Sequence, residues 1–120
     1  MGRREGVRAQ DSPLVRIVAY TPDLMDRSKI SAAASAASHE LTYAGTPEAL
    51  VGLAGVDAVI VDLSKKGAVD VLADIAAGSA RVLAYASHVD IPRLSPTLPA
   101  DVDVLPRSKF FGSLSELLRG

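Results

Sequence analysis

The segment VDAVIVDL, residues 56–63, decides the fold of this chain. Its residues 58–61 are all apolar, and a strand that is apolar on both faces is typical of the centre of a parallel sheet. Asp62 follows this run directly. A buried carboxylate is costly unless the strand ends there, at the open edge of the sheet. We therefore expect Asp62 at the carboxyl end of a central strand.

Other segments have the same short, β-branched pattern. Together with the central segment, the expected strands cover residues 14–20, 41–44, 56–63, 81–85 and 102–105. The segments 41–44 and 102–105 are the weakest of them, so we expect these two strands nearer the edges of the sheet.

Apolar residues with helical spacing separate these strands. The two clearest helical faces consist of Ile30, Ala33, Ala34 and Ala37, and of Ala68, Val71, Leu72, Ile75 and Ala76. Gly78 supplies a C-terminal stop for the second of these helices.

Signals for helix ends complete the pattern. Thr46 and Pro47 form an N-cap with proline at the first helical position. Ser113 and Glu116 form a capping box ahead of the last helix. Residues 89–99 contain three prolines, so the fourth helix should be short or broken.

The resulting order alternates strands and helices, which gives a parallel sheet with helices on both faces. Five strands in a chain of 120 residues match the flavodoxin-like doubly wound fold with strand order 2-1-3-4-5. We expect one domain over residues 14–120. Residues 1–13 are polar and charged, and we interpret them as a flexible leader outside that domain.

The composition excludes several classes of protein. The chain has no Cys, a net charge of −1 and an estimated pI of about 6.1. It therefore offers no disulfide framework or thiolate metal site, and no general attraction to nucleic acid. No apolar run is long enough to span a membrane, and we expect a cytoplasmic protein. Arg3, Arg4 and Arg8 are interpreted as a solvated tail rather than a DNA-binding arm.

Polar residues at the strand ends mark the predicted site, because ligands of such sheets bind at the carboxyl edge. These residues are Thr21, Asp23, Asp62, Ser87, His88, Arg107 and Lys109. For Asp62 the structural alternative is a strand terminator that caps the next turn. For the loop after the fourth strand the alternative is that Asp90 caps a short helix. His39 lies on the opposite edge, and we assign it no role.

The segment with Asp62 resembles the phosphoacceptor strand of response-regulator receiver domains, and the resemblance extends over residues 14–119. It implies a CheY-like fold, with Asp62 in the position of the phosphorylated aspartate. Receivers carry a lysine after the fifth strand, where this chain has Arg107, with Lys109 two residues later. They have Thr or Ser at the end of the fourth strand, where this chain has Ala86 and then Ser87.

The chain also departs from the receiver pattern. The acidic pair that binds Mg²⁺ in receivers is replaced by Thr21-Pro22, and only Asp23 follows. A Mg²⁺ site of Asp62 and Asp23 would be weak, because it has only two carboxylates and Mg²⁺ prefers several hard oxygen ligands. Arginine in place of lysine keeps the positive charge but replaces a compact ammonium group by a planar guanidinium. The chain thus resembles a stand-alone bacterial pseudo-receiver, and we expect neither enzymatic activity nor a cofactor.

The leading functional hypothesis is a signalling module that acts through protein–protein contacts. We expect its contact face at the fourth and fifth strands, with Tyr85, Phe110 and Phe111 as candidates and one of the two Phe rings exposed. The partner would be a histidine kinase or another signalling protein, or a second copy in a homodimer. Two alternatives stay open: phosphorylation of Asp62, and anion binding by Arg107 and His88.

Overall fold

The computed structural model describes residues 15–99 and 102–119. The expected leader, residues 1–13 with its arginines, and the first residue of the expected 14–20 strand lie outside this part of the chain.

Five parallel strands form one sheet. They are β1 (Arg16–Tyr20), β2 (Glu40–Tyr43), β3 (Ala58–Asp62), β4 (Arg81–Ala86) and β5 (Val104–Pro106). Their order is β2-β1-β3-β4-β5, which confirms the flavodoxin-like topology. Every residue of β3 is buried, as expected for a central apolar strand. The observed β5 begins two residues later than the expected strand at 102–105.

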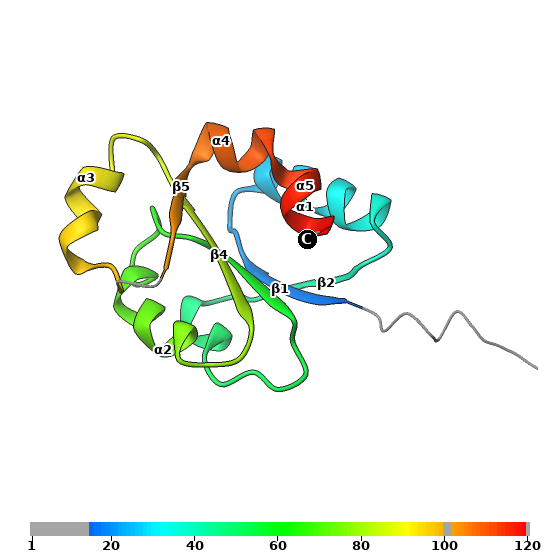
Figure 1. Ribbon diagram of the computed structural model, residues 1–120, viewed down its shortest axis with the longest axis horizontal. Coiled ribbons are helices and arrows are strands. Elements are labelled where there is room, and N and C mark those ends of the chain that lie inside the picture. Colours follow the sequence, from blue (N-terminus) through cyan, green and yellow to red (C-terminus); the bar gives the residue numbers. More distant parts are fainter. Residues whose placement is uncertain (1–14, 100–101, 120) are drawn as a thin grey trace, which may run out of the picture.

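Helices cover both faces of the sheet (Figure 1). On one face lie α1 (Leu24–Ala36), α4 (Arg107–Gly112) and α5 (Leu114–Arg119). On the other face lie α2 (Leu72–Ala76) and α3 (Ile91–Leu94). Each face has its own apolar core, and the alternation of side chains along the strands divides the buried residues between the two.

The core under α1, α4 and α5 contains the two largest fully buried rings. Its buried members are Ile17, Ala19, Ile30, Ala34, Ala58, Ile60, Tyr85, Phe110, Leu114 and Leu118. The opposite core is aliphatic, and Val59, Val61 and Leu63 of the central strand region pack there against Leu72 and Ile75 of α2.

Two of the expected helices are shorter than the sequence indicates. The helix expected after Thr46 is a 3-10 turn, Pro47–Leu50, because Gly52 adopts a positive φ of 72° and turns the chain away. The helix expected around Ala68 begins as a 3-10 turn, Val69–Val71, and continues as α2. The fourth helix, α3, is followed by a 3-10 turn at Ser95–Thr97, which confirms the short or broken helix.

The C-terminal helix differs from the expectation because a break divides it. The short helix α4 begins directly after Pro106, and α5 follows after Ser113. The hydroxyl of Ser113 donates to the carbonyl of Lys109 at 2.8 Å. In the described part of the chain Ser113 is therefore the C-cap of α4. The predicted capping box is wrong, because the Ser113 hydroxyl bonds to Lys109 and not to the backbone of Glu116. No helix among the described residues is long and apolar enough to cross a membrane.

Candidate functional site

Asp62 lies at the carboxyl edge of the sheet, at the end of β3, as the sequence predicts. Its side chain is only 1% exposed. Its Oδ1 accepts hydrogen bonds from the backbone N–H of Ser64 at 3.0 Å and from the Ser64 hydroxyl at 2.5 Å. Asp62 therefore caps the turn after β3, which is the structural alternative that the sequence left open.

The strongest polar contact at this edge joins Asp26 and Arg107. Asp26 lies in the first turn of α1 and is completely buried. Arg107, the first residue of α4, donates from Nη1 to Asp26 Oδ2 at 2.5 Å and from Nη2 to Oδ1. This fork-to-fork pair is the strong, geometrically specific form of an arginine–carboxylate contact. The hydrogen bond with Asp26 raises the pKa of Arg107 above its ordinary value, against the opposing effect of burial.

Tyr85 completes this cluster from the end of β4. Its hydroxyl donates to Asp26 Oδ2 at 3.1 Å and lies 3.4 Å from Oγ1 of Thr21, which is itself fully buried. Burial raises the pKa of Tyr85 well above its usual range, and the charges of Asp62 and Asp26 act in the same direction. The carboxylate of Asp26 is thus held by an arginine and a tyrosine, as a buried charge requires.

Aromatic rings surround the arginine of this pair. Tyr85 stacks on Phe110 with ring centroids 4.6 Å apart, and Phe111 meets Tyr85 edge-on at 5.2 Å. The guanidinium carbon of Arg107 lies 5.2 Å from the Phe111 ring centroid and 5.9 Å from that of Tyr85. These contacts, which suit a guanidinium, fix Arg107 in its pairing with Asp26.

Asp23 serves as the N-cap of α1 rather than as a partner of Asp62. Its Oδ1 accepts the backbone N–H groups of Met25 at 2.9 Å and of Asp26 at 3.1 Å. The N–H of Asp26 is the main cause that lowers the pKa of Asp23, and the positive charges of Arg107 and Lys65 contribute. Asp23 is exposed, and its carboxylate oxygen is already used to start the helix.

The loop after β4 forms a separate polar cluster. The Ser87 hydroxyl donates to Asp90 Oδ2 at 3.0 Å and accepts the Asp90 N–H at 3.2 Å. Asp90 also pairs with Arg93 at 3.0 Å, and this contact is the main cause that lowers its pKa. Asp90 is the N-cap residue of α3, as the structural alternative has it, but its side chain makes no capping hydrogen bond to this helix. His88 and Lys109 are exposed, and no hydrogen bond or ion pair joins either side chain to another described residue.

Four of the seven residues predicted as one site therefore fall into three groups. Thr21 and Arg107 belong to the Asp26 cluster, Asp62 pairs with Ser64, and Ser87 pairs with Asp90. Asp23 and Asp62 each use Oδ1 as a cap, and Asp26 is paired with arginine. Within residues 15–99 and 102–119, no three His, Cys, Asp or Glu side chains are arranged to hold a metal ion.

The predicted interaction face is corrected by the burial of its aromatic residues. Tyr85 and Phe110 are both 0% exposed, so neither can contact a partner in this conformation. Phe111 is half-buried, beside Lys29, whose Nζ lies 5.1 Å from the ring centroid. The two adjacent Phe rings do face differently, but both take part in holding Arg107 or its neighbour Tyr85.

Solved structures with this fold include response regulators. A response regulator from Thermotoga maritima matches with a TM-score of 0.66 and 13% identity, over 89% of this chain and 96% of that one. A CheY-like response regulator from Mesorhizobium loti matches with a TM-score of 0.63 and 18% identity, over 89% of this chain and 98% of that one.

A de novo designed Rossmann 2x3 protein matches almost as well, with a TM-score of 0.62 and 14% identity over 88% of this chain and 90% of that one. The fold is therefore CheY-like, and at these identities the likeness shows the fold alone. No protein-family model matches the chain, and no curated protein matches it.

In this fold the carboxyl edge is the usual place for a ligand. Here that edge holds a buried carboxylate, a paired arginine and a capped aspartate. The charged side chains at this edge are thus engaged in contacts within the chain.

Proposed function

We propose that the chain is a receiver-like signalling module that acts through protein–protein contacts and whose phosphorylation site is degraded. The observation that carries the proposal is the pair between Asp26 and Arg107. Arg107 follows the fifth strand, where receivers have a lysine. In this chain the cation at that position is committed to an internal carboxylate.

Phosphoryl transfer to a carboxylate needs positive charge on the phosphoryl oxygens, from a metal ion and from a basic side chain. In this chain the residues that correspond to those of receivers are engaged in other contacts. The arginine is held in a fork by Asp26, and the two aspartates that could bind Mg²⁺ act as caps. Asp62 is also 1% exposed, so a phosphoryl donor would have to open the turn at Ser64.

A groove on the face of β4, β5, α4 and α5 supports the protein-contact part of the proposal. The groove has a volume of about 290 Å³, and its apolar lining includes Leu83, Leu105 and Leu117. It lies beside β5, an edge strand with no further neighbour in the described sheet. Apolar grooves beside a sheet edge suit protein segments. We propose a partner protein such as a histidine kinase, or a second copy of the chain, in the cytoplasm, with no contact to nucleic acid or membrane and no enzymatic activity.

The first experiment tests the degraded site. The protein is incubated with Mg²⁺ and acetyl phosphate, and its intact mass is measured over time. We expect no stoichiometric phosphoryl adduct. An adduct that forms in the wild type and in Asp90→Asn but is absent in Asp62→Asn would contradict the proposal. It would establish the alternative, a response regulator phosphorylated on Asp62.

The second experiment tests the contact face. Leu105→Glu puts a charge into the groove, whereas Leu24→Glu changes a residue that is 76% exposed on α1. We expect Leu105→Glu to abolish capture of the partner, or dimerisation in analytical ultracentrifugation, while Leu24→Glu leaves it intact. Equal loss in both variants, or retention in both, would place the contact face elsewhere.

A further inference from the structure

We propose that a cavity at the amino-terminal edge of the sheet binds a small organic carboxylate with an apolar body. The cavity has a volume of about 260 Å³. It lies at the opposite end of the strands from Asp62. The proposal is therefore independent of the proposed function.

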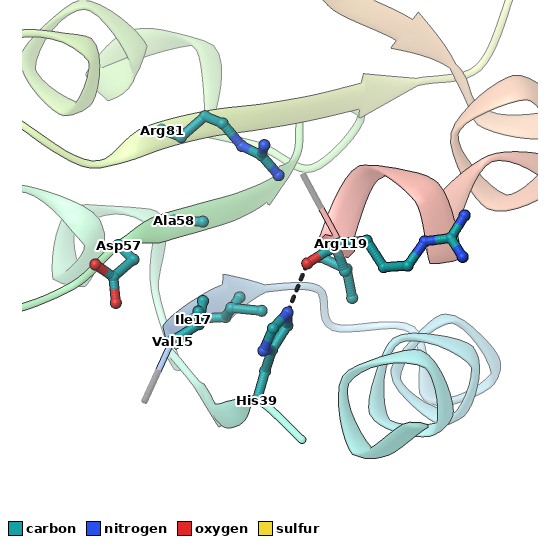
Figure 2. A pocket seen from close by; sticks show the side chains of 8 residues that line it. Val15, Ile17, His39, Asp57, Ala58, Arg81 and Arg119 are labelled. Carbon is teal, nitrogen blue, oxygen red and sulfur yellow. Dashed lines mark hydrogen bonds between the residues drawn. The ribbon is translucent and has the colours of Figure 1, made fainter. Parts of the chain in front are cut away.

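Several elements meet at this cavity (Figure 2). The starts of β1, β3 and β4 contribute Ile17, Ala58 and Arg81, and the segment between α1 and β2 contributes His39. The end of α5 closes one side with Leu118. Because the sheet itself forms the floor, the position of these groups is set by rigid strands rather than by one loop.

The floor of the cavity is apolar and well packed. Ile17, Ala58 and Leu118 are 2%, 5% and 5% exposed, and the half-buried Val15 adjoins them. An apolar cavity of roughly 150 Å³ can hold benzene, and drug-sized ligands occupy about 300–1,000 Å³. The volume found here lies between these values, so it suits one ring or a branched chain of similar size.

Two basic side chains border this floor, and their orientation is fixed. Arg81 Nη2 donates to the carbonyl of Leu117, and His39 Nε2 lies 2.5 Å from the carbonyl oxygen of Leu118. Both residues thereby hold the last turn of α5. An arginine has five N–H donors in a planar fork, so the bond to Leu117 leaves donors for a carboxylate. Side chains fixed before binding lose little entropy when a ligand arrives.

The direction of the charged groups favours an anion. In Figure 2 the side chains of Arg81 and His39 point into the cavity from opposite sides, whereas the Arg119 guanidinium points away from it. The acidic residue of the lining, Asp57, accepts the backbone N–H of Arg16 at 2.8 Å through Oδ2 and lies beside the start of β3, across that strand from Arg81 in this view. A ligand carboxylate would meet Arg81, and its apolar body would cover Ile17 and Ala58.

Benzoate is a suitable probe, with benzamide as its neutral counterpart of the same shape. Each is titrated into the full ¹⁵N-labelled chain, and amide shifts are followed by NMR. We expect saturable shifts at Ile17, Ala58 and Leu118 with benzoate. Benzamide should bind about tenfold more weakly or worse, because its neutral amide cannot form an ion pair with Arg81.

Two variants and two controls locate the site. Arg81→Gln should weaken benzoate binding by about tenfold or more. Because this change also frees the end of α5, Ala58→Val provides a second test that fills the cavity and keeps the arginine. Arg93→Gln, on the opposite edge, and Asp62→Asn should bind benzoate as the wild type does.

Several results would overturn the inference. They are shifts that do not saturate, equal affinity for benzamide, or benzoate binding that Ala58→Val leaves unchanged. Benzoate binding tests this cavity, and phosphorylation of Asp62 tests the proposed function. Because Asp62→Asn is expected to bind benzoate as the wild type does, either proposal can fail without the other.

Discussion

The two edges of the sheet use their charged side chains in opposite ways. At the carboxyl edge, Asp26 and Arg107 bind each other and aromatic rings close around them. At the amino edge, Arg81 and His39 bind the end of α5 and border a cavity with an apolar floor. The edge where ligands of this fold usually lie thus carries internal contacts between charged side chains, and the proposed carboxylate cavity lies at the other end.

The largest expected effect concerns the aromatic packing that closes the carboxyl edge. Phe110→Ala removes a fully buried ring that stacks on Tyr85, and we expect it to lower the free energy of unfolding by about 3–5 kcal/mol. Phe111→Ala removes a half-buried ring and should cost less than half as much. Urea unfolding followed by circular dichroism measures both. Equal losses would mean that Phe110 is less central than its burial indicates.

The second effect concerns the charge pair. Arg107→Gln leaves Asp26 buried without its cation, and we expect a loss of about 2–4 kcal/mol. The lower part of this range is favoured because the Arg107 side chain is 41% exposed. Lys109→Gln, two residues along α4, should change the free energy of unfolding by less than about 0.5 kcal/mol. Similar effects of both changes would refute a special role for Arg107.

The third effect compares the space at the two edges. Ala19 is 0% exposed next to the last residue of β1, and Ala19→Val should cost about 1–3 kcal/mol through overpacking. Ala58 borders the amino-edge cavity, so Ala58→Val should cost less than about 1 kcal/mol. Thermal unfolding of the two variants gives the comparison. A larger loss at position 58 would show that the cavity is not available to an added methyl group.

The smallest effect is the pH dependence that Tyr85 contributes. Burial raises its pKa in the folded state, so above the unfolded value of ~10 the unfolded chain releases a proton that the folded chain keeps. Stability is therefore present below pH ~10 and falls above it, by about 1.4 kcal/mol per pH unit from this group. Tyr85→Phe should cost about 1 kcal/mol near neutral pH.

The difference between wild type and Tyr85→Phe should then narrow as the pH rises above ~10. Unfolding free energies of both proteins, measured at several alkaline pH values, test this. Parallel curves would mean that the Tyr85 hydroxyl ionises as readily in the folded chain as in the unfolded one.

The sheet could be predicted from the sequence because a single strong signal located its centre. The apolar run at residues 58–61 can only be buried on both faces, and Asp62 after it marks the open edge. The order of the other strands follows from alternation with helices. The weak fifth strand begins two residues later and ends one residue later than expected, since a short edge strand has few apolar contacts to define its ends.

The centre of the polar site was missed, although a signal for it exists. Asp23 is a typical N-cap residue, and Asp26 lies four residues before Ile30, on the buried face of the same helix. Extending the apolar spacing back by one turn would have placed a buried carboxylate at the carboxyl edge. The partner, Arg107, could not be identified, because its contact spans 81 positions of sequence and depends on the short helix α4.

The aromatic pair shows what local sequence cannot decide. Adjacent Phe110 and Phe111 were expected to face in different directions, which the structure bears out in part. Phe110 is the ring that packs inward, because α4 turns it directly onto Tyr85, and Phe111 is half-buried. Helix α4 has only six residues, and helices of that length form through tertiary packing rather than through local propensity.

A double-mutant cycle between Asp26 and Arg107 tests the central claim most directly. The free energies of unfolding of the wild type, Asp26→Asn, Arg107→Gln and the double variant are measured in urea. If the arginine is committed to this internal carboxylate, we expect a coupling energy of at least about 1.5 kcal/mol. A coupling energy within about 0.5 kcal/mol of zero would contradict the account, because Arg107 would then be free to serve Asp62.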